Sequence, residues 1–181
     1  MHNPDVKRAL KDCMGELVDI QKILLPTNIR LNKITKYLTN YSIIKACGTI
    51  EYAYKCLIAD YFGEAQSEYI KNFLSKRIRD SSANPDMSII YGMLNSFDKN
   101  IEKRFKDLLK QELNRNILVS SLNSLRTERN TLAHGGSSII PFSDVLKYFK
   151  DSRRIIQILD NSLYFSSTTD IAVFFVKISS L

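Results

Sequence analysis

The stretch of sequence that decides the fold runs from residue 114 to residue 136 and reads NRNILVSSLNSLRTERNTLAHGG. Its apolar stripe advances in steps of four, three, four and three residues, which is the spacing of one face of an α-helix. The stripe consists of Leu118, Leu122, Leu125, position 129 and Leu132. Gly135 and Gly136 follow it, and glycine readily adopts the left-handed conformation that ends many helices. The sequence therefore predicts an amphipathic helix from about Asn114 to His134.

Arginine occupies position 129 on this apolar stripe. A buried charge must be paired, or must face a cleft or a partner chain, because its isolation in the core costs several kcal/mol. Arg126, Asn130 and His134 form a polar ladder beside Arg129 at four-residue steps. The helix C-terminus favours a positive charge, which suits His134 as a proton donor. The other histidine, His2, is expected at a frayed N-terminus; the alternative for His134 is that it only caps the last helical carbonyls.

Helical periodicity recurs on both sides of this stretch and predicts further helices. They cover residues 4–24, 34–61, 67–79, 88–97, 98–109 and 143–163. Six glycines and four prolines are too few for the turns of many short strands. Residues 171–177 are β-branched and aromatic without helical period. The sequence thus predicts an all-α fold, an antiparallel bundle of five or more helices over residues 1–163, with residues 164–181 as a short strand or ordered C-terminal tail.

Charge, cysteine content and hydropathy limit the classes of protein to which the chain can belong. The 181 residues carry a formal net charge of +7, which is compatible with an anionic partner such as RNA and equally with a soluble, lysine-rich surface. Cys13, Cys47 and Cys56 lie in apolar-periodic stretches without CxxC spacing, so they are interpreted as reduced core residues. No apolar run is long enough to cross a membrane, and the N-terminus does not resemble a secretion signal. We therefore expect a cytoplasmic protein.

Glu51 is a second charge on an apolar helix face. It falls between Ile44 and Ile58 at seven-residue steps in the helix predicted over residues 34–61. One hypothesis is that Glu51 reaches Arg129 across the helix interface and orients it. The alternative is a local ion pair with Lys55, four residues further along the same helix.

The string Arg129-Asn130-Thr131-Leu132-Ala133-His134-Gly135 resembles the RxxxxH motif of the HEPN superfamily of helical-bundle ribonucleases. Together with the run from Ala46 to Glu51, it is most similar to the HEPN branch named after its association with ribosomal L-PSP proteins. The resemblance extends over roughly residues 30 to 163 and implies a metal-independent endoribonuclease. Such proteins are usually homodimers whose motifs meet at the interface, and they often act as toxins or in antiviral defence.

Carried onto this sequence, the resemblance implies that Arg129 and His134 are catalytic and that Asn130 supports them. Glu51 and Arg126 are predicted as further supporting residues from their positions in the helical pattern. It implies RNA as substrate, no cofactor, no metal, and a cognate antitoxin or regulatory protein as a partner. RNA cleavage by the 2′-hydroxyl needs a base, an acid and a cation near phosphorus. Each chain offers only one usable histidine for the two proton transfers. A two-fold dimer would bring a second His134 and a second Arg129 to the same phosphate. The alternatives are a non-catalytic RNA-binding or protein-interaction module and a purely structural helical scaffold.

Overall fold

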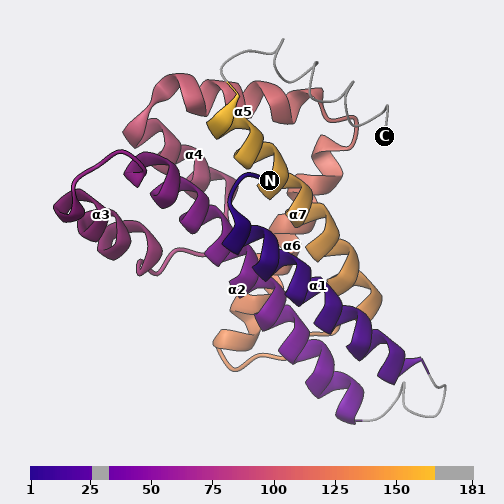
Figure 1. Ribbon diagram of the computed structural model, residues 1–181. Coiled ribbons are helices and arrows are strands. Elements are labelled where there is room, and N and C mark those ends of the chain that lie inside the picture. Colours follow the sequence, from indigo (N-terminus) through magenta and orange to yellow (C-terminus); the bar gives the residue numbers. More distant parts are fainter. Residues whose placement is uncertain (26–32, 166–181) are drawn as a thin grey trace.

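A computed structural model describes residues 1–25 and 33–165 of the chain. Within these residues it contains seven α-helices and no strand (Figure 1), which confirms the predicted all-α fold. The helices are α1 (Pro4–Leu24), α2 (Lys33–Gly63), α3 (Glu68–Leu74), α4 (Met87–Phe97), α5 (Lys99–Gln111), α6 (Arg115–Ala133) and α7 (Phe142–Tyr164). A π-helical turn, η1 (Ser75–Arg79), continues α3. No helix among the described residues is long and apolar enough to cross a membrane.

The core lies where α2, α6 and α7 meet. The last helix, α7, packs along both α6 and α2, and α1 covers another side of α2 (Figure 1). Ile50, Leu122 and Phe149, one from each central helix, are fully buried. Because α2 has neighbours on several sides, its buried residues are spread around the helix instead of forming a single stripe. Helices α2 and α7 thereby support α6 from the core side.

The N-terminal residues are docked on the bundle, so the expectation of a frayed N-terminus is wrong. The backbone N–H of His2 donates to both carboxylate oxygens of Asp160, at 3.1 and 2.9 Å, and its ring stacks on Tyr164. Asp160 on α7 is fully buried. Asn3 caps α1 by accepting from the backbone N–H groups of Asp5 and Val6. Contacts with α7, which follows far along the chain, thus hold the first residues in place.

Helix α6 ends where the two glycines predict. The backbone N–H of Gly135 donates to the carbonyl of Leu132 at 3.1 Å, and that of Gly136 donates to Thr131 at 2.8 Å. This is the Schellman arrangement, and Gly135 adopts the left-handed conformation it requires, with φ of 78°. A Cβ at Gly136 would lie 2.8 Å from the Thr131 carbonyl oxygen. Both glycines therefore help to fix the end of α6 beside His134.

The bundle of described residues ends with α7 at Tyr164, and Phe165 is extended. Of the C-terminal tail predicted over residues 164–181, residues 166–181 lie outside the described residues. The strand or ordered extension predicted there stays a prediction. The division into a bundle over residues 1–163 and a tail likewise stays a prediction.

Candidate active site

Helix α6 presents the motif residues near its C-terminal end. Arg129 and Asn130 are half-buried, whereas His134 is exposed at the helix terminus. The side chain of His134 makes no hydrogen bond with any described residue, and its backbone N–H continues the helix by donating to Asn130 at 3.1 Å. The structure thus places a half-buried guanidinium and a solvent-accessible imidazole five residues apart at the end of the same helix.

The charge of Arg129 is not neutralised by a carboxylate within the described part of the chain. Its Nη1 donates to Oδ1 of Asn130 at 3.3 Å, and this acceptor is neutral. Arg126, one turn earlier, instead forms an ion pair with Asp86, the N-cap residue of α4. Of the two arginines, Arg129 is therefore the one whose positive charge is available to an anionic ligand.

The polar side chain of Asn130 is shared between α6 and a loop. Asn84 donates from Nδ2 to the Asn130 Oδ1 at 3.0 Å. Asn84 belongs to residues 80–86, which connect η1 to α4 and are called the 80–86 loop from here on. This loop contacts α6 twice, through the pairs Asn84–Asn130 and Asp86–Arg126.

Helix α2 holds the same loop from the other side. Tyr54 donates from its hydroxyl to the carbonyl of Ala83 at 2.7 Å. The buried ammonium of Lys55 donates to the carbonyl of Ser81 and to the carboxylate of Glu51. Glu51 also accepts from the backbone N–H of Ala83 at 3.4 Å. The 80–86 loop is therefore bonded to α2 and α6 at once.

Glu51 pairs with Lys55 and not with Arg129. This is the local alternative predicted from the four-residue spacing, and the cross-helix hypothesis is wrong. The position of Glu51 on an inward face is explained by the 80–86 loop, which brings backbone polar groups to α2. Glu51 is thus connected to the motif only indirectly: it contacts the 80–86 loop, and the loop contacts Asn130.

Sequence reasoning identified Arg126, Arg129, Asn130 and His134 but not the residues of the loop that contact them. For the segment that contains Asn84 and Asp86, the sequence predicts only a loop followed by the start of a helix. The sole local signal is Asp86, a good N-cap residue before α4. Nothing in the local sequence indicates that Asn84 would meet Asn130, 46 residues further along.

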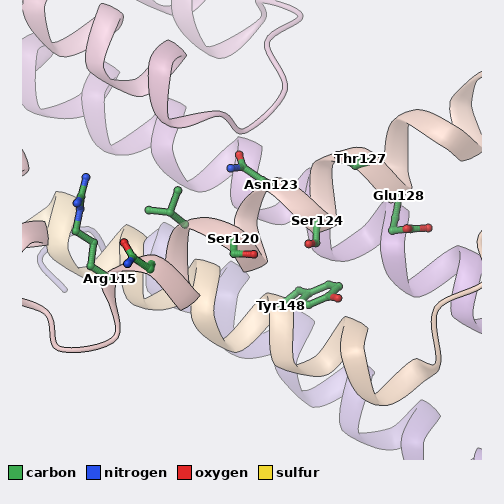
Figure 2. Close-up of a pocket in the computed structure, with 9 residues that line it drawn as sticks. Arg115, Ser120, Asn123, Ser124, Thr127, Glu128 and Tyr148 are labelled. Carbon is green, nitrogen blue, oxygen red and sulfur yellow. The ribbon is translucent and has the colours of Figure 1, made fainter.

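A groove lies along α6 on the N-terminal side of the motif, and Arg129, Asn130 and His134 are not among the residues that line it (Figure 2). It has a volume of about 460 Å³. Ser120, Asn123, Ser124, Thr127 and Glu128 lie along one wall, and Tyr148 of α7 lies opposite them. Asn123, Thr127, Asn130 and His134 follow one another at steps of four, three and four residues, so these four residues share one side of α6. Arg129 lies about 100° round the helix from Asn130, on the inward stripe. Hydroxyl and amide groups of this kind contact phosphate and sugar oxygens in nucleic-acid complexes.

Cys47 lies beneath the site on α2. Burial raises the pKa of its thiol to about 12, an effect that the nearby positive charges of Arg129 and Arg126 only partly offset. Burial also raises the pKa of Cys13 and Cys56. All three are free, buried thiols, which confirms their interpretation as core residues.

We expect the native thiols to resist alkylation. Only the thiolate reacts, and a pKa of about 12 instead of 9.0 lowers the thiolate fraction of Cys47 at pH 8 by about 1,000-fold. Iodoacetamide labelling at pH 8, followed by mass spectrometry, should modify Cys47 rapidly in urea and very slowly in buffer. The native rate should rise about tenfold per pH unit. Equal labelling in urea and in buffer would contradict the buried environment.

The described residues, 1–25 and 33–165, contain no group of three or more His, Cys, Asp or Glu side chains arranged as metal ligands. The chemistry that the site offers with its own side chains is cationic stabilisation by Arg129 and proton transfer by His134. Both are suited to a phosphodiester, whose oxygens carry negative charge and whose leaving group needs a proton.

A comparison with protein families finds a match to the model described as RiboL-PSP-HEPN over residues 8–164. The match includes the motif of α6, the 80–86 loop and Glu51. It begins earlier in the chain than the resemblance seen in the sequence, so it takes in most of α1 as well. No curated protein and no solved structure matches the chain.

Proposed function

Because the chain belongs to the RiboL-PSP-HEPN family, we propose that it is a metal-independent endoribonuclease whose catalytic residues are Arg129 and His134. The observation that carries the proposal is the unequal pairing of two neighbouring arginines. Arg126 is neutralised by Asp86, whereas Arg129 rests on the neutral Asn130. A half-buried guanidinium without a carboxylate partner is suited to binding a phosphate in its planar fork.

In the proposed reaction the 2′-oxygen of a ribose attacks the adjacent phosphorus. The bond from phosphorus to the 5′-oxygen of the next nucleotide breaks, which leaves a 2′,3′-cyclic phosphate and a 5′-hydroxyl. A base removes the proton from the 2′-hydroxyl, and an acid gives a proton to the departing 5′-oxygen. Arg129 stabilises the negative charge that develops on the non-bridging oxygens, and His134 transfers protons.

The proposal includes a homodimer, because two proton transfers are assigned to imidazoles and each chain supplies one to the site. The second histidine of the chain, His2, is engaged with Asp160 and Tyr164. A two-fold axis beside the C-terminal end of α6 would bring two copies of His134 and two of Arg129 to one phosphate. One imidazole would then act as base and the other as acid.

The proposed biological setting is that of a toxin or antiviral-defence effector acting on cytoplasmic RNA. An unrestrained ribonuclease would damage its own cell, so a cognate antitoxin or regulatory protein belongs to the proposal. The net charge of +7 favours association with RNA, and the groove of Figure 2 provides polar contacts for an RNA strand that passes along α6.

A second candidate function is a non-catalytic module that binds RNA or a regulatory partner. One observation favours it: His134 is exposed, and no described residue holds its ring by a hydrogen bond. A catalytic imidazole is normally oriented by such a partner. In the ribonuclease proposal, the orienting group comes from the second subunit or from the substrate.

The deciding experiment is the incubation of mixed cellular RNA with the purified protein in excess EDTA. We expect fragments with cyclic phosphate and 5′-hydroxyl ends, and a rate about 100- to 1,000-fold lower for Arg129→Ala, the usual loss when one oxyanion donor is removed. The melting temperature of Arg129→Ala should stay close to that of the wild type, because Arg129 forms no ion pair within residues 1–25 and 33–165.

Arg8→Ala is the matched control, since it also removes one arginine charge but from the exposed start of α1. It should cleave RNA like the wild type. Cleavage of equal rate by all three proteins would point to a contaminating nuclease. RNA binding without cleavage by the wild type would favour the non-catalytic module.

A further inference from the structure

Asn84 contacts the motif without belonging to it. Its Nδ2 donates to Asn130 Oδ1 at 3.0 Å, and the same oxygen accepts from Arg129 Nη1 at 3.3 Å. The Asn130 oxygen therefore lies between two donors, one from the 80–86 loop and one from the arginine proposed to bind phosphate.

This arrangement decides which way the Asn130 amide points. An asparagine amide can present its oxygen or, after a half turn, its NH₂ group at almost the same position. The half-turned amide would set its NH₂ group against two other donors, Asn84 Nδ2 and the Arg129 guanidinium. Arg129 can only donate, so it requires the Asn130 oxygen, and Asn84 adds a second donor that holds the amide in this orientation.

The position of Asn84 is itself well determined. On one side of it, Tyr54 donates to the carbonyl of Ala83 at 2.7 Å. On the other side Pro85 is buried and Asp86 pairs with Arg126. Contacts on both flanks therefore hold the Asn84 side chain against α6.

We propose that Asn84 is a positioning residue that orients Arg129 through Asn130. The inference rests on the proposed ribonuclease function, in which Arg129 binds the scissile phosphate. Asn84 touches neither substrate nor reacting atoms; it restricts the guanidinium to the direction set by the Asn130 oxygen. Removing it leaves Arg129 charged and bonded to an Asn130 amide that is itself less restrained, which slows the chemical step more than it weakens RNA binding.

The test measures kcat and KM separately, on an RNA oligonucleotide taken from a site that the wild type cleaves. Asn84→Ala is expected to lower kcat about 5- to 10-fold, the effect of one hydrogen bond, with a KM changed less than twofold. Asn84→Asp, which presents oxygen in place of the donor, should lower kcat at least as much. Ser82→Ala, at an exposed position of the same loop, is the matched control and should leave both constants unchanged.

A double-mutant cycle distinguishes positioning from a general structural effect. Because Asn84 acts through Asn130, Asn84→Ala should have no further effect on kcat in the Asn130→Ala background. The same 5- to 10-fold loss in both backgrounds would overturn the proposal. Unchanged kcat for Asn84→Ala in a wild type that cleaves RNA would also overturn it, while leaving the ribonuclease assignment intact.

A second measurement does not depend on cleavage. In ¹⁵N-labelled protein, the Nε–H signal of Arg129 should shift and exchange faster with solvent in Asn84→Ala, but not in Ser82→Ala. Unaltered position and exchange in Asn84→Ala would refute the positioning role even if the wild type proved inactive. A wild type that cleaves no RNA but shows the altered Arg129 signal in Asn84→Ala would refute only the proposed function.

Discussion

Replacing His134 with alanine is expected to slow RNA cleavage by about 100- to 10,000-fold, the range measured for loss of a general acid or base. The protein should remain folded, because the His134 side chain is exposed and makes no hydrogen bond with any described residue. Single-turnover cleavage of end-labelled RNA measures the chemical step, and thermal unfolding followed by circular dichroism checks the fold. Both experiments are done in EDTA.

The other histidine of the chain provides the control. His2→Ala should cleave RNA like the wild type, although it should melt at a lower temperature, because its ring contacts Asp160 and stacks on Tyr164. The two histidine variants are thus expected to behave in opposite ways. Normal cleavage by His134→Ala would remove the imidazole from the mechanism, and the cleavage would then have to come from another group of the protein or from a contaminating nuclease.

Replacing Glu51 with alanine is expected to destabilise the protein by about 3 kcal/mol, near the lower end of the range for breaking a buried ion pair. The loss is large because the side chain of Lys55 is only 5% exposed and would lose its carboxylate partner, with only the Ser81 carbonyl left as acceptor. It lies at the lower end because the Glu51 side chain is 20% exposed, so water screens part of the interaction. Urea unfolding measures the difference in free energy.

The double variant Glu51→Ala with Lys55→Met tests this explanation. Methionine retains the apolar stem at position 55 and removes the charge, so the double variant should be more stable than Glu51→Ala alone. If Lys55→Met does not restore stability, the cost belongs to lost packing around the 80–86 loop and not to an unpaired ammonium. Arg129→Ala, by contrast, leaves no carboxylate of the described residues without its partner and should unfold like the wild type.

The sequence predicts those parts of the fold and site that depend on local spacing. Helix α6 follows from its apolar stripe, and its end follows from Gly135 and Gly136, because a left-handed turn after a helix favours glycine. The inward placement of Arg129 and the exposure of the helix terminus at His134 follow from the same periodicity.

The remaining contacts join residues far apart in the chain, and local spacing carries no information about them. Asn84 meets Asn130 across 46 residues, and His2 meets Asp160 across 158 residues. Glu51 is an example in which local spacing predicts one property and a distant contact decides another. Its inward face could be predicted from periodicity, but the choice between Lys55 and Arg129 as its partner depended on where the 80–86 loop lies.

The 80–86 loop also determines how much of the chain would have to be transplanted to build this site elsewhere. A peptide of α6 alone would contain Arg129 and His134, but it would lack the donor that orients Asn130 and the carboxylate that neutralises Arg126. The loop in turn needs Tyr54 and the Glu51–Lys55 pair to hold its backbone. The smallest graft that keeps these contacts therefore runs from Glu51 to His134. The geometry of a short motif at the end of one helix thus depends on about half of the domain.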